Sequence, residues 1–290
     1  MLLYELLKKF DEIYITQRLK PTTANGYRVN IRLHILPYLS DKDILALTVD
    51  DLDDLTVLFQ NKGLCNRTIV YVHATLRKCL NFGIRRGFLL HNPYNQFDMP
   101  RKKRFEYTVL NEDQISLVLD KCRGTRIETA VILALCYGMR RGEILGILPS
   151  DFDSVNGVLH IQRSRTLVNG SEVITDCKTN NSNRYVLISP LHYYLFSNVS
   201  QFSISPWTLD VLFHDFAVSL GLPKGLRFHD LRHSYATLML QKGINPKIVS
   251  QILGHSSVSV TLDIYSHPLV DVQSVCLDVF ESVEKKKAPM

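Results

Sequence analysis

Five basic side chains and one tyrosine in the second half of the chain could together act on a phosphate ester. In chain order they are Arg140, Lys178, His229, Arg232, His255 and Tyr265. Arginine, lysine and histidine side chains can hold phosphate oxygens and neutralise the negative charge of a transition state. A tyrosine hydroxyl can serve as a covalent nucleophile. Because the cations are side chains, this chemistry requires no metal ion.

The first two motifs surround Arg140 and Lys178. In Gly-Met-Arg-Arg-Gly-Glu, Arg140 precedes Glu143 by three residues, and Arg141 is the neighbour that could take its place. Lys178 opens Lys-Thr-Asn-Asn-Ser-Asn-Arg, which ends at Arg184 and lies between two β-prone runs. A lysine in such a turn can protonate a departing oxygen, which is a general-acid role. Taken alone, each of these residues could also be an ordinary surface charge.

The remaining motifs contain the two histidines, the second arginine and the tyrosine. His229 and Arg232 are three residues apart in His-Asp-Leu-Arg, so they share a face if a helix begins there. His255 follows Leu-Gly, and Tyr265 comes ten residues later. A phenol with an unperturbed pKa of about 10 is a poor nucleophile until nearby cations favour its ionised form. The chain has 13 tyrosines, and Tyr265 is distinguished by its place after Leu-Gly-His.

Together these motifs resemble the tyrosine recombinases of the phage-integrase family, which cut and rejoin DNA at specific sites. The most specific match is the run from Leu226 to Thr237, and the blocks around Arg140 and Lys178 add to it. The resemblance implies Glu143 as an acid that supports the site. It also implies a 3′-phosphotyrosine intermediate, which stores the energy of the phosphodiester bond, so no nucleotide cofactor is expected.

The resemblance also assigns catalytic roles. Arg140, Arg232 and His255 would hold the phosphoryl oxygens. Lys178 would protonate the leaving oxygen, and His229 would balance protons at the tyrosine. The ten-residue interval before the tyrosine is typical of phage and transposon integrases, whereas many Xer-type recombinases have one residue fewer. We therefore expect an integrase that inserts or excises a mobile element.

Composition and charge agree with a nucleic-acid partner without requiring one. The 290 residues suit one large or two medium domains, and the formal charge of +6 favours a polyanion. The candidate DNA contacts are Arg101, Lys102, Lys103, Arg104, Arg141 and Arg184. The alternative for the run at 101–104 is a solvated tether. The six cysteines lack zinc-ligand spacing, so we expect free thiols and no metal. The chain shows neither a signal peptide nor a membrane-length apolar run, so we expect no membrane contact and a cytoplasmic location.

The elements that must position these residues follow from hydrophobic periodicity and turn signals. In the first part we expect helices over residues 2–17 and 21–36, one from Asp50, and one from Asn66 to about Gly87. Pro37 should end the second helix, because proline disfavours helix in the residue before it. Four helices with short connections predict a compact bundle.

The second part should be mainly helical with a few strands. Asn111 should cap a helix, and an apolar helix over Thr125–Met139 should end at Gly138, with Arg140 at the break. Strands are expected over Val158–Ile161, Glu172–Thr175 and Tyr185–Ile188, with a hairpin turn at Asn169-Gly170. Helices should resume over 207–220 and 230–241.

We therefore predict a mainly α fold with a small antiparallel β-sheet, in which an α-helical core-binding (SAM-like) domain spans residues 1–98. A basic linker spans 99–108, and a tyrosine-recombinase catalytic domain with a C-terminal tail spans 109–290. The expected partners are double-stranded DNA attachment sites, further copies in a homotetramer on two duplexes, and an excisionase or DNA-bending accessory protein. The tail after Pro268 could dock onto a neighbouring subunit or pack on its own.

Three other functions stay open from the sequence. An Xer-type recombinase that resolves dimers or inverts DNA would use the same chemistry. A DNA-binding regulator could have the fold without cleaving, although Tyr265 and Lys178 argue against it. A type IB topoisomerase would share the nucleophile, but the integrase-like first four helices argue against that class.

Overall fold

The computed structural model describes residues 1–101, 107–176, 183–197, 204–255 and 257–265. The side chains of residues 260 and 263–265 are also outside the description. The chain separates into two compact units, whose main segments are residues 1–105 for unit 1, and residues 106–167 with 172–290 for unit 2. The predicted linker at 99–108 straddles this division, and its residues 102–106 lie outside the described part.

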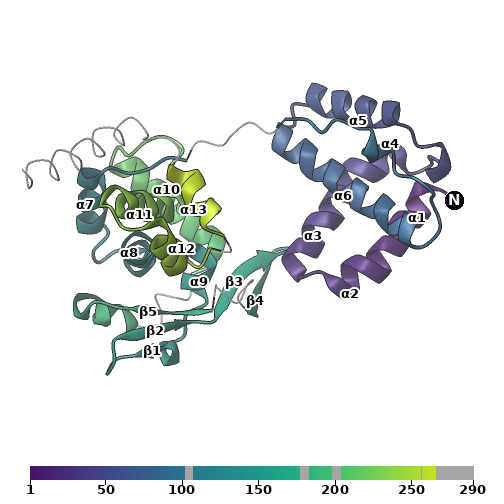
Figure 1. Ribbon diagram of the computed structural model, residues 1–290. Helices are drawn as coiled ribbons and strands as arrows, with labels where there is room; N and C mark the ends of the chain where they lie inside the picture. The colour runs from purple at the N-terminus through teal and green to yellow at the C-terminus, as the bar shows by residue number, and fades with distance from the viewer. Residues whose placement is uncertain (102–106, 177–182, 198–203, 256, 266–290) are drawn as a thin grey trace, which may run out of the picture. The chain divides into compact units, whose positions relative to one another are not determined.

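Unit 1 is a bundle of helices (Figure 1). They are α1 (Leu3–Phe10), α2 (Thr16–Arg18), α3 (Pro21–Asn30), α4 (Leu36–Leu39), α5 (Val49–Asn61) and α6 (Asn66–Arg85). Short 3₁₀ turns cover Ile44–Ala46 and Pro93–Asn95. Two π-helical turns, Asp11–Ile15 and Ile31–Ile35, join α1 to α2 and α3 to α4 without a break. The four predicted helical stretches are therefore present.

The prediction that Pro37 ends the second of these stretches is wrong. The helical run that begins at Pro21 continues to Leu39, and Pro37 is the second residue of α4. In a regular α-helix the proline ring clashes with the carbonyl one turn earlier, and the missing N–H removes a hydrogen bond. The π-helical turn over Ile31–Ile35 widens the backbone directly before the proline, so the chain accommodates the ring without leaving the helix.

The core of unit 1 forms because apolar residues recur at helical spacing on each helix. Phe10, Phe59 and Leu76, from α1, α5 and α6, are fully buried together. His73 is one of several buried polar side chains of unit 1. Both its ring nitrogens are hydrogen-bonded, to Thr56 Oγ1 at 2.9 Å and to the Tyr94 hydroxyl at 2.7 Å. Burial lowers the pKa of His73 to about 4, so the ring is neutral at neutral pH.

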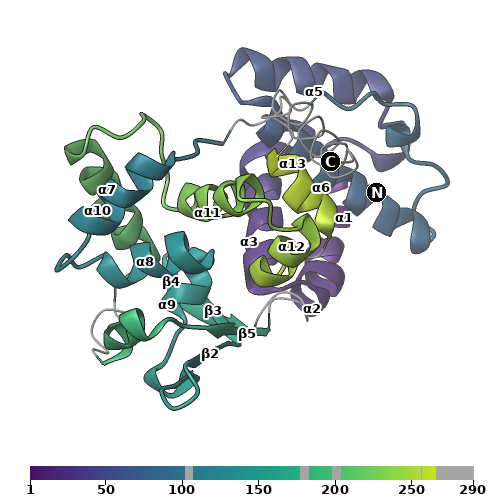
Figure 2. The ribbon, with the colours of Figure 1, turned by 60° about the vertical axis from the view of Figure 1, so that its left-hand side comes forward.

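Unit 2 contains the remaining helices and, apart from Val168 and Ser171, the strands of the described residues (Figures 1 and 2). The helices are α7 (Glu112–Lys121), α8 (Glu128–Tyr137), α9 (Arg141–Leu145), α10 (Pro206–Ser219), α11 (Asp230–Gln241), α12 (Pro246–Leu253) and α13 (Val258–Tyr265). Two 3₁₀ turns cover Pro149–Asp151 and Pro190–Phe196. The strands are β1 (Phe152–Asp153), β2 (Val158–Ile161), β3 (Arg163–Val168), β4 (Ser171–Asp176) and β5 (Arg184–Leu187).

The strands form two small sheets where the sequence predicted one. β2 pairs antiparallel with β5 and with the short β1, whereas the hairpin of β3 and β4 forms a separate two-stranded sheet. The turn at Asn169-Gly170 is present, with φ of 51° and 79°, as a tight hairpin requires. The strand over Arg163–Val168 was missed because its alternating arginine, serine and threonine residues carry no apolar face.

The interior of unit 2 is built on α8, whose residues from Glu128 to Leu135 are all buried. α11 packs against α8, and α12 and α13 pack against α11 and each other. Gly138 ends α8 in the left-handed conformation, with φ of 62°. A Cβ atom there would lie 2.5 Å from Leu253 Cδ2 and 2.7 Å from Tyr235 Cδ1, so glycine lets α8, α11 and α12 meet closely.

No helix in the described ranges is long and apolar enough to cross a bilayer.

Candidate active site

Three arginines from different elements of unit 2 converge on the C-terminal end of α12. They donate to three successive backbone carbonyls: Arg184 Nε to Ile252 O at 2.8 Å, Arg232 Nη2 to Leu253 O at 2.7 Å, and Arg140 Nη2 to Gly254 O at 2.9 Å. The last carbonyls of a helix have no partner within it and carry the negative end of the helix dipole. The end of α12 therefore binds positive side chains through backbone carbonyls. Because these carbonyls carry no formal charge, the arginines keep their positive charge.

Each arginine is placed there by a local feature of the sequence. Arg140 follows the left-handed turn at Gly138 and is the N-cap residue of α9. Arg232 lies in the first turns of α11, and its Nη1 also donates to Gly138 O at 2.6 Å. Arg184 begins β5. The sequence prediction of a break after the apolar helix, with Arg140 at that break, is confirmed.

Glu143 connects two of these arginines. Its side chain is 3% exposed and accepts from Arg140 Nη1 at 2.6 Å and from Arg184 Nη2 at 3.0 Å. It also accepts from the backbone N–H of Arg140 at 3.0 Å, which caps α9. Burial acts to raise the pKa of Glu143, but Arg184 and Arg140 outweigh it and hold that pKa below its ordinary value.

The cluster keeps an excess of positive charge. Among the described residues, three guanidinium groups face one carboxylate, which leaves an excess of two positive charges at a site where Glu143 and Arg232 are buried. Arg232 is 3% exposed, and burial together with Arg140 lowers its pKa to about 9, so it is still protonated at neutral pH. Buried charge of this kind is costly unless an anion compensates it. The arrangement suits a phosphate, which guanidinium groups bind through paired N–H donors.

The histidines beside the cluster are neutral in the protein alone. Burial, with Arg232 and Arg140 adding to it, lowers the pKa of His255 to about 3, and its Nδ1 lies 2.8 Å from Thr261 Oγ1 on α13. His229, the N-cap residue of α11, is exposed at the surface, yet desolvation and the charge of Arg232 lower its pKa as well. A neutral imidazole can accept a proton, whereas an imidazolium cannot.

His233 is the neighbour of these groups. Its ring is 3.9 Å from the ring of Tyr107 and 5.1 Å from that of His229, centre to centre. Burial lowers the pKa of His233 to about 4. The ring planes are inclined by 36° and 87°, so His233 packs against both neighbours without stacking on either.

Of two further predicted catalytic residues, the structure describes only the backbone of Tyr265 and no part of Lys178. Tyr265 is the last residue of α13, one helical turn beyond Thr261, whose hydroxyl bonds to His255. Tyr265 is thus on the same helix as Thr261, which contacts His255, and the side chain of Tyr265 lies outside the description. Lys178 also lies outside the described residues.

The predicted DNA contacts occupy different environments. Arg101 is exposed, and its carbonyl accepts from Asn66 Nδ2 at 3.0 Å. Lys102, Lys103 and Arg104 lie outside the described residues. Arg141 is paired with Asp210 and its side chain is 37% exposed, whereas the side chain of Arg184 is only 9% exposed.

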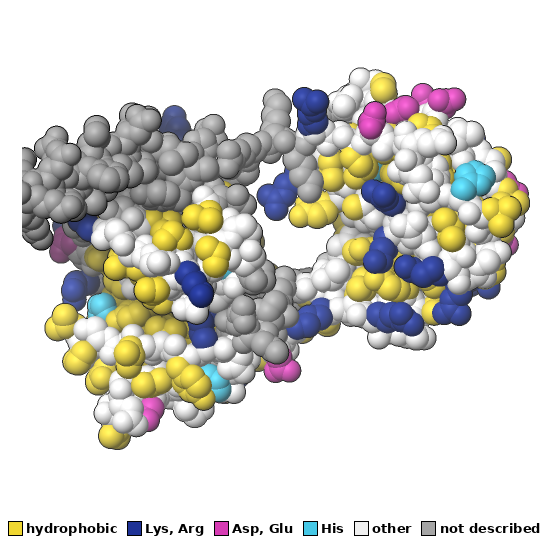
Figure 3. All heavy atoms as spheres, in the orientation of Figure 1, with side chains coloured by type: hydrophobic (Ala, Val, Ile, Leu, Met, Phe, Trp, Pro, Cys, Tyr) yellow, Lys and Arg dark blue, Asp and Glu magenta, His cyan; other side chains and the backbone are white. Residues whose placement is uncertain are grey.

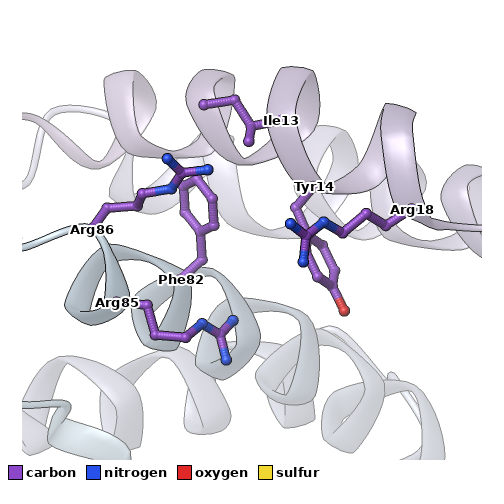
Figure 4. Close-up of a pocket in the computed structure, with 6 residues that line it drawn as sticks. All are labelled: Ile13, Tyr14, Arg18, Phe82, Arg85 and Arg86. Atoms are coloured by element: carbon purple, nitrogen blue, oxygen red, sulfur yellow. The ribbon is translucent and has the colours of Figure 1, made fainter.

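A basic pocket in unit 1 was missed by the sequence analysis. It has a volume of about 250 Å³ and is lined by Ile13, Tyr14, Arg18, Phe82, Arg85 and Arg86. In Figure 4 the guanidinium group of Arg86 lies beside the Phe82 ring, that of Arg18 lies beside the Tyr14 ring, and Arg85 extends below Phe82. On the face in Figure 3, Lys and Arg side chains gather over α2, α3 and α6, and acidic ones over α5. The pair Arg85-Arg86 at a helix end, with Arg18 four residues after Tyr14, was the signal available in the sequence.

Comparison with known proteins decides the family. A model described as the phage integrase family matches residues 108–271, more than half of the chain. The chain belongs to the phage integrase family. A second model, the phage integrase N-terminal SAM-like domain, matches residues 2–57 of this integrase. The integrase is therefore a tyrosine recombinase, an enzyme that breaks and rejoins DNA strands, and the predicted family and fold class are confirmed.

Individual relatives include integrases and Xer recombinases. The integrase is similar to the ICEBs1 integrase of Bacillus subtilis (strain 168), with 23% identity over 91% of this chain and 78% of that protein. It is also similar to tyrosine recombinase XerC of Alcanivorax borkumensis, with 27% identity over 87% of this chain and 85% of that protein.

Solved structures share the fold of this integrase. A fragment of the Tn1549 transposon integrase in complex with transposon right end DNA matches with a TM-score of 0.83 and 19% identity, over 97% of this chain and 100% of that one. A lambda integrase tetramer bound to a Holliday junction matches with a TM-score of 0.71 and 17% identity, over 91% of this chain and 77% of that one.

Proposed function

We propose that this recombinase integrates or excises a mobile element by cutting and rejoining DNA through a 3′-phosphotyrosine at Tyr265. The observation that carries the proposal is the arginine cluster at the end of α12, with two positive charges in excess and His255 beside it. A phosphodiester has one negative charge, and the pentavalent transition state of its displacement has two. The cluster is therefore matched better to the transition state than to the bound DNA, which is the condition for catalysis.

In the first step, the Tyr265 oxygen attacks the scissile phosphorus, and the bond from phosphorus to the 5′ oxygen breaks. Arg140, Arg232 and His255 hold the non-bridging oxygens. His229, which is neutral, takes the phenolic proton, and Lys178 gives a proton to the departing 5′ oxygen. Strand joining is the reverse: a 5′ hydroxyl of the partner duplex attacks the phosphotyrosine and restores the phenol. No external energy source enters, because one phosphoester replaces another.

We further propose that both units bind duplex DNA through its phosphates. Arg18, Arg85 and Arg86 form no ion pair among the described residues, so their charges are available to DNA. The run Arg101–Arg104 and Arg141 are the other candidate contacts. The working assembly is a homotetramer on two duplexes in the cytoplasm, with an excisionase or DNA-bending protein as accessory factor. The lambda integrase tetramer on a Holliday junction supports this assembly.

A covalent-capture experiment tests the function. The protein is mixed with fragmented DNA of its host and element and denatured in SDS, and DNA that stays attached is recovered and sequenced. The wild type and the control Tyr185→Phe, which alters an exposed tyrosine of β5, should both give adducts. Tyr265→Phe should give none while still binding DNA. Tight binding without an adduct in the wild type would point instead to a non-cleaving regulator.

The XerC relative favours one second candidate, the resolution of chromosome or plasmid dimers. The sequenced ends separate the two functions. Ends that join an element to a chromosomal target indicate integration and excision. Captured DNA ends that all map to one site, present once in each of two identical replicons, indicate dimer resolution, because no mobile element flanks such a site.

A further inference from the structure

We propose that Arg184 is a positioning residue of the active site and not a DNA contact. It binds Glu143 together with Arg140 and holds the end of α12. The positive charge of Arg140 is therefore only partly neutralised by Glu143 and can bind phosphate. The inference rests on the proposed function. It concerns how the site is held, and it assigns Arg184 a role different from the phosphate contact that its sequence position suggested.

The first argument is the direction of the side chain. Arg184 Nη2 and Nη1 donate to Glu143 Oε2 and Oε1 at 3.0 Å and 3.2 Å, while Nε donates to Ile252 O at 2.8 Å. The guanidinium fork is thus turned onto a buried carboxylate and a helix end, and the side chain is 9% exposed. A DNA phosphate could reach it only by displacing these charge-assisted bonds.

The second argument is electrostatic. Glu143 Oε1 accepts from both Arg140 Nη1 and Arg184 Nη1, so one negative charge is divided between two cations. Without Arg184, the carboxylate would face Arg140 in a one-to-one ion pair with no net charge. Arg140 would then attract a phosphate less strongly. This loss of attraction would be greater in the transition state, where the negative charge is larger.

The third argument is geometric. Arg184 bonds to Ile252 O, and Arg140 bonds to Gly254 O two residues further along the same helix end. His255 follows directly and bonds through its backbone N–H to Ser250 O at 3.0 Å. Arg184 therefore touches both structures that support Arg140, the carboxylate and the end of α12, and releasing it frees both at once.

The test compares chemistry with binding on a nicked duplex of the recombination site, using the full chain. Arg184→Gln should slow formation of the Tyr265 adduct at saturating DNA by about tenfold or more, with Kd within about twofold of wild type and an unchanged salt dependence. Arg184→Lys keeps the charge but not the forked guanidinium, and its rate of adduct formation should lie between those of the wild type and Arg184→Gln. Arg163→Gln is the matched control, because it removes an arginine from another buried carboxylate, Asp151, at 2.6 Å.

A double mutant separates positioning from a general loss of structure. If Arg184 acts by restraining Glu143, then Arg184→Gln with Glu143→Gln should form the adduct faster than Arg184→Gln alone. Additive losses in the double mutant would overturn the proposal. So would a weaker Kd with a salt slope reduced by about 0.9, which is the signature of a lost phosphate contact. If wild type forms no adduct, the proposed function fails, and the binding measurements still decide the role of Arg184.

Discussion

Replacing Glu143 with glutamine should destabilise unit 2 and make its stability depend on anions. The carboxylate is 3% exposed and is bonded to both Arg140 and Arg184. Removing one partner of a buried ion pair costs about 3–5 kcal/mol, because the charges left behind stay unpaired. Glutamine keeps one acceptor oxygen, so we expect a loss of ~3 kcal/mol in the free energy of unfolding. For a unit of this size, that loss lowers Tm by about 6–12 °C.

The same substitution leaves three guanidinium groups without a counter-charge. Inorganic phosphate or duplex DNA should then bind the folded variant more tightly than the folded wild type, and binding to the folded state raises Tm. The rise in Tm on adding 100 mM phosphate should therefore be larger for Glu143→Gln than for wild type. Trp207 is the sole tryptophan and lies on α10, so its fluorescence anisotropy follows the unfolding of unit 2.

Asp151→Asn is the matched control for this prediction. Asp151 is also a buried carboxylate of unit 2, bonded to Arg163 at 2.6 Å, and it lies outside the arginine cluster. We expect a comparable loss of stability without the added response to phosphate. An equal response of the two variants, or an unchanged Tm in Glu143→Gln, would refute the view that this carboxylate balances an anion site.

Three other results are expected. Gly138→Ala should cost about 2–4 kcal/mol, combining strain at positive φ with the close approach to Leu253, as measured by urea unfolding; a cost below 0.5 kcal/mol would contradict the packing described. The pKa of His73 is about 4 when folded and near 6.5 when unfolded, so the unfolded state binds more protons between these values. Unit 1 should thus lose about 3 kcal/mol as the pH falls from 7 to 4, and His73→Gln should flatten that loss; an equal slope in the variant would assign it to other groups. Neutralising Arg101–Arg104 should weaken DNA binding and flatten its salt dependence, and an unchanged slope would make the run a tether.

Local sequence signals predicted the parts of the fold that depend on neighbouring residues. Asn111 caps α7 by accepting from Gln114 N at 2.8 Å, Gly138 ends α8, and Asn169-Gly170 makes the hairpin turn. Each depends on a side chain or backbone preference that acts within a few residues. The prediction that Arg140 follows the break after the apolar helix is likewise confirmed.

Features that depend on distant partners could not be predicted in this way. The continuation of the helix through Pro37 requires a π-helical turn, and no residue type in the sequence predicts such a turn. The bonds from Arg184 and Arg140 to the end of α12 join residues 68 and 114 positions apart. Whether an arginine points outward to DNA or inward to Glu143 is decided by such tertiary partners, so a basic residue in a motif does not reveal its role.

The most direct test of the central claim is to identify the residue joined to DNA. The wild-type protein is trapped on a nicked duplex of its recombination site, digested with protease and nuclease, and analysed by mass spectrometry. The account predicts one adduct, a phosphotyrosine at Tyr265 linked to the 3′ end of the cut strand, with a free 5′ hydroxyl on the other fragment. An adduct on any other residue, or a link to the 5′ end, would contradict it.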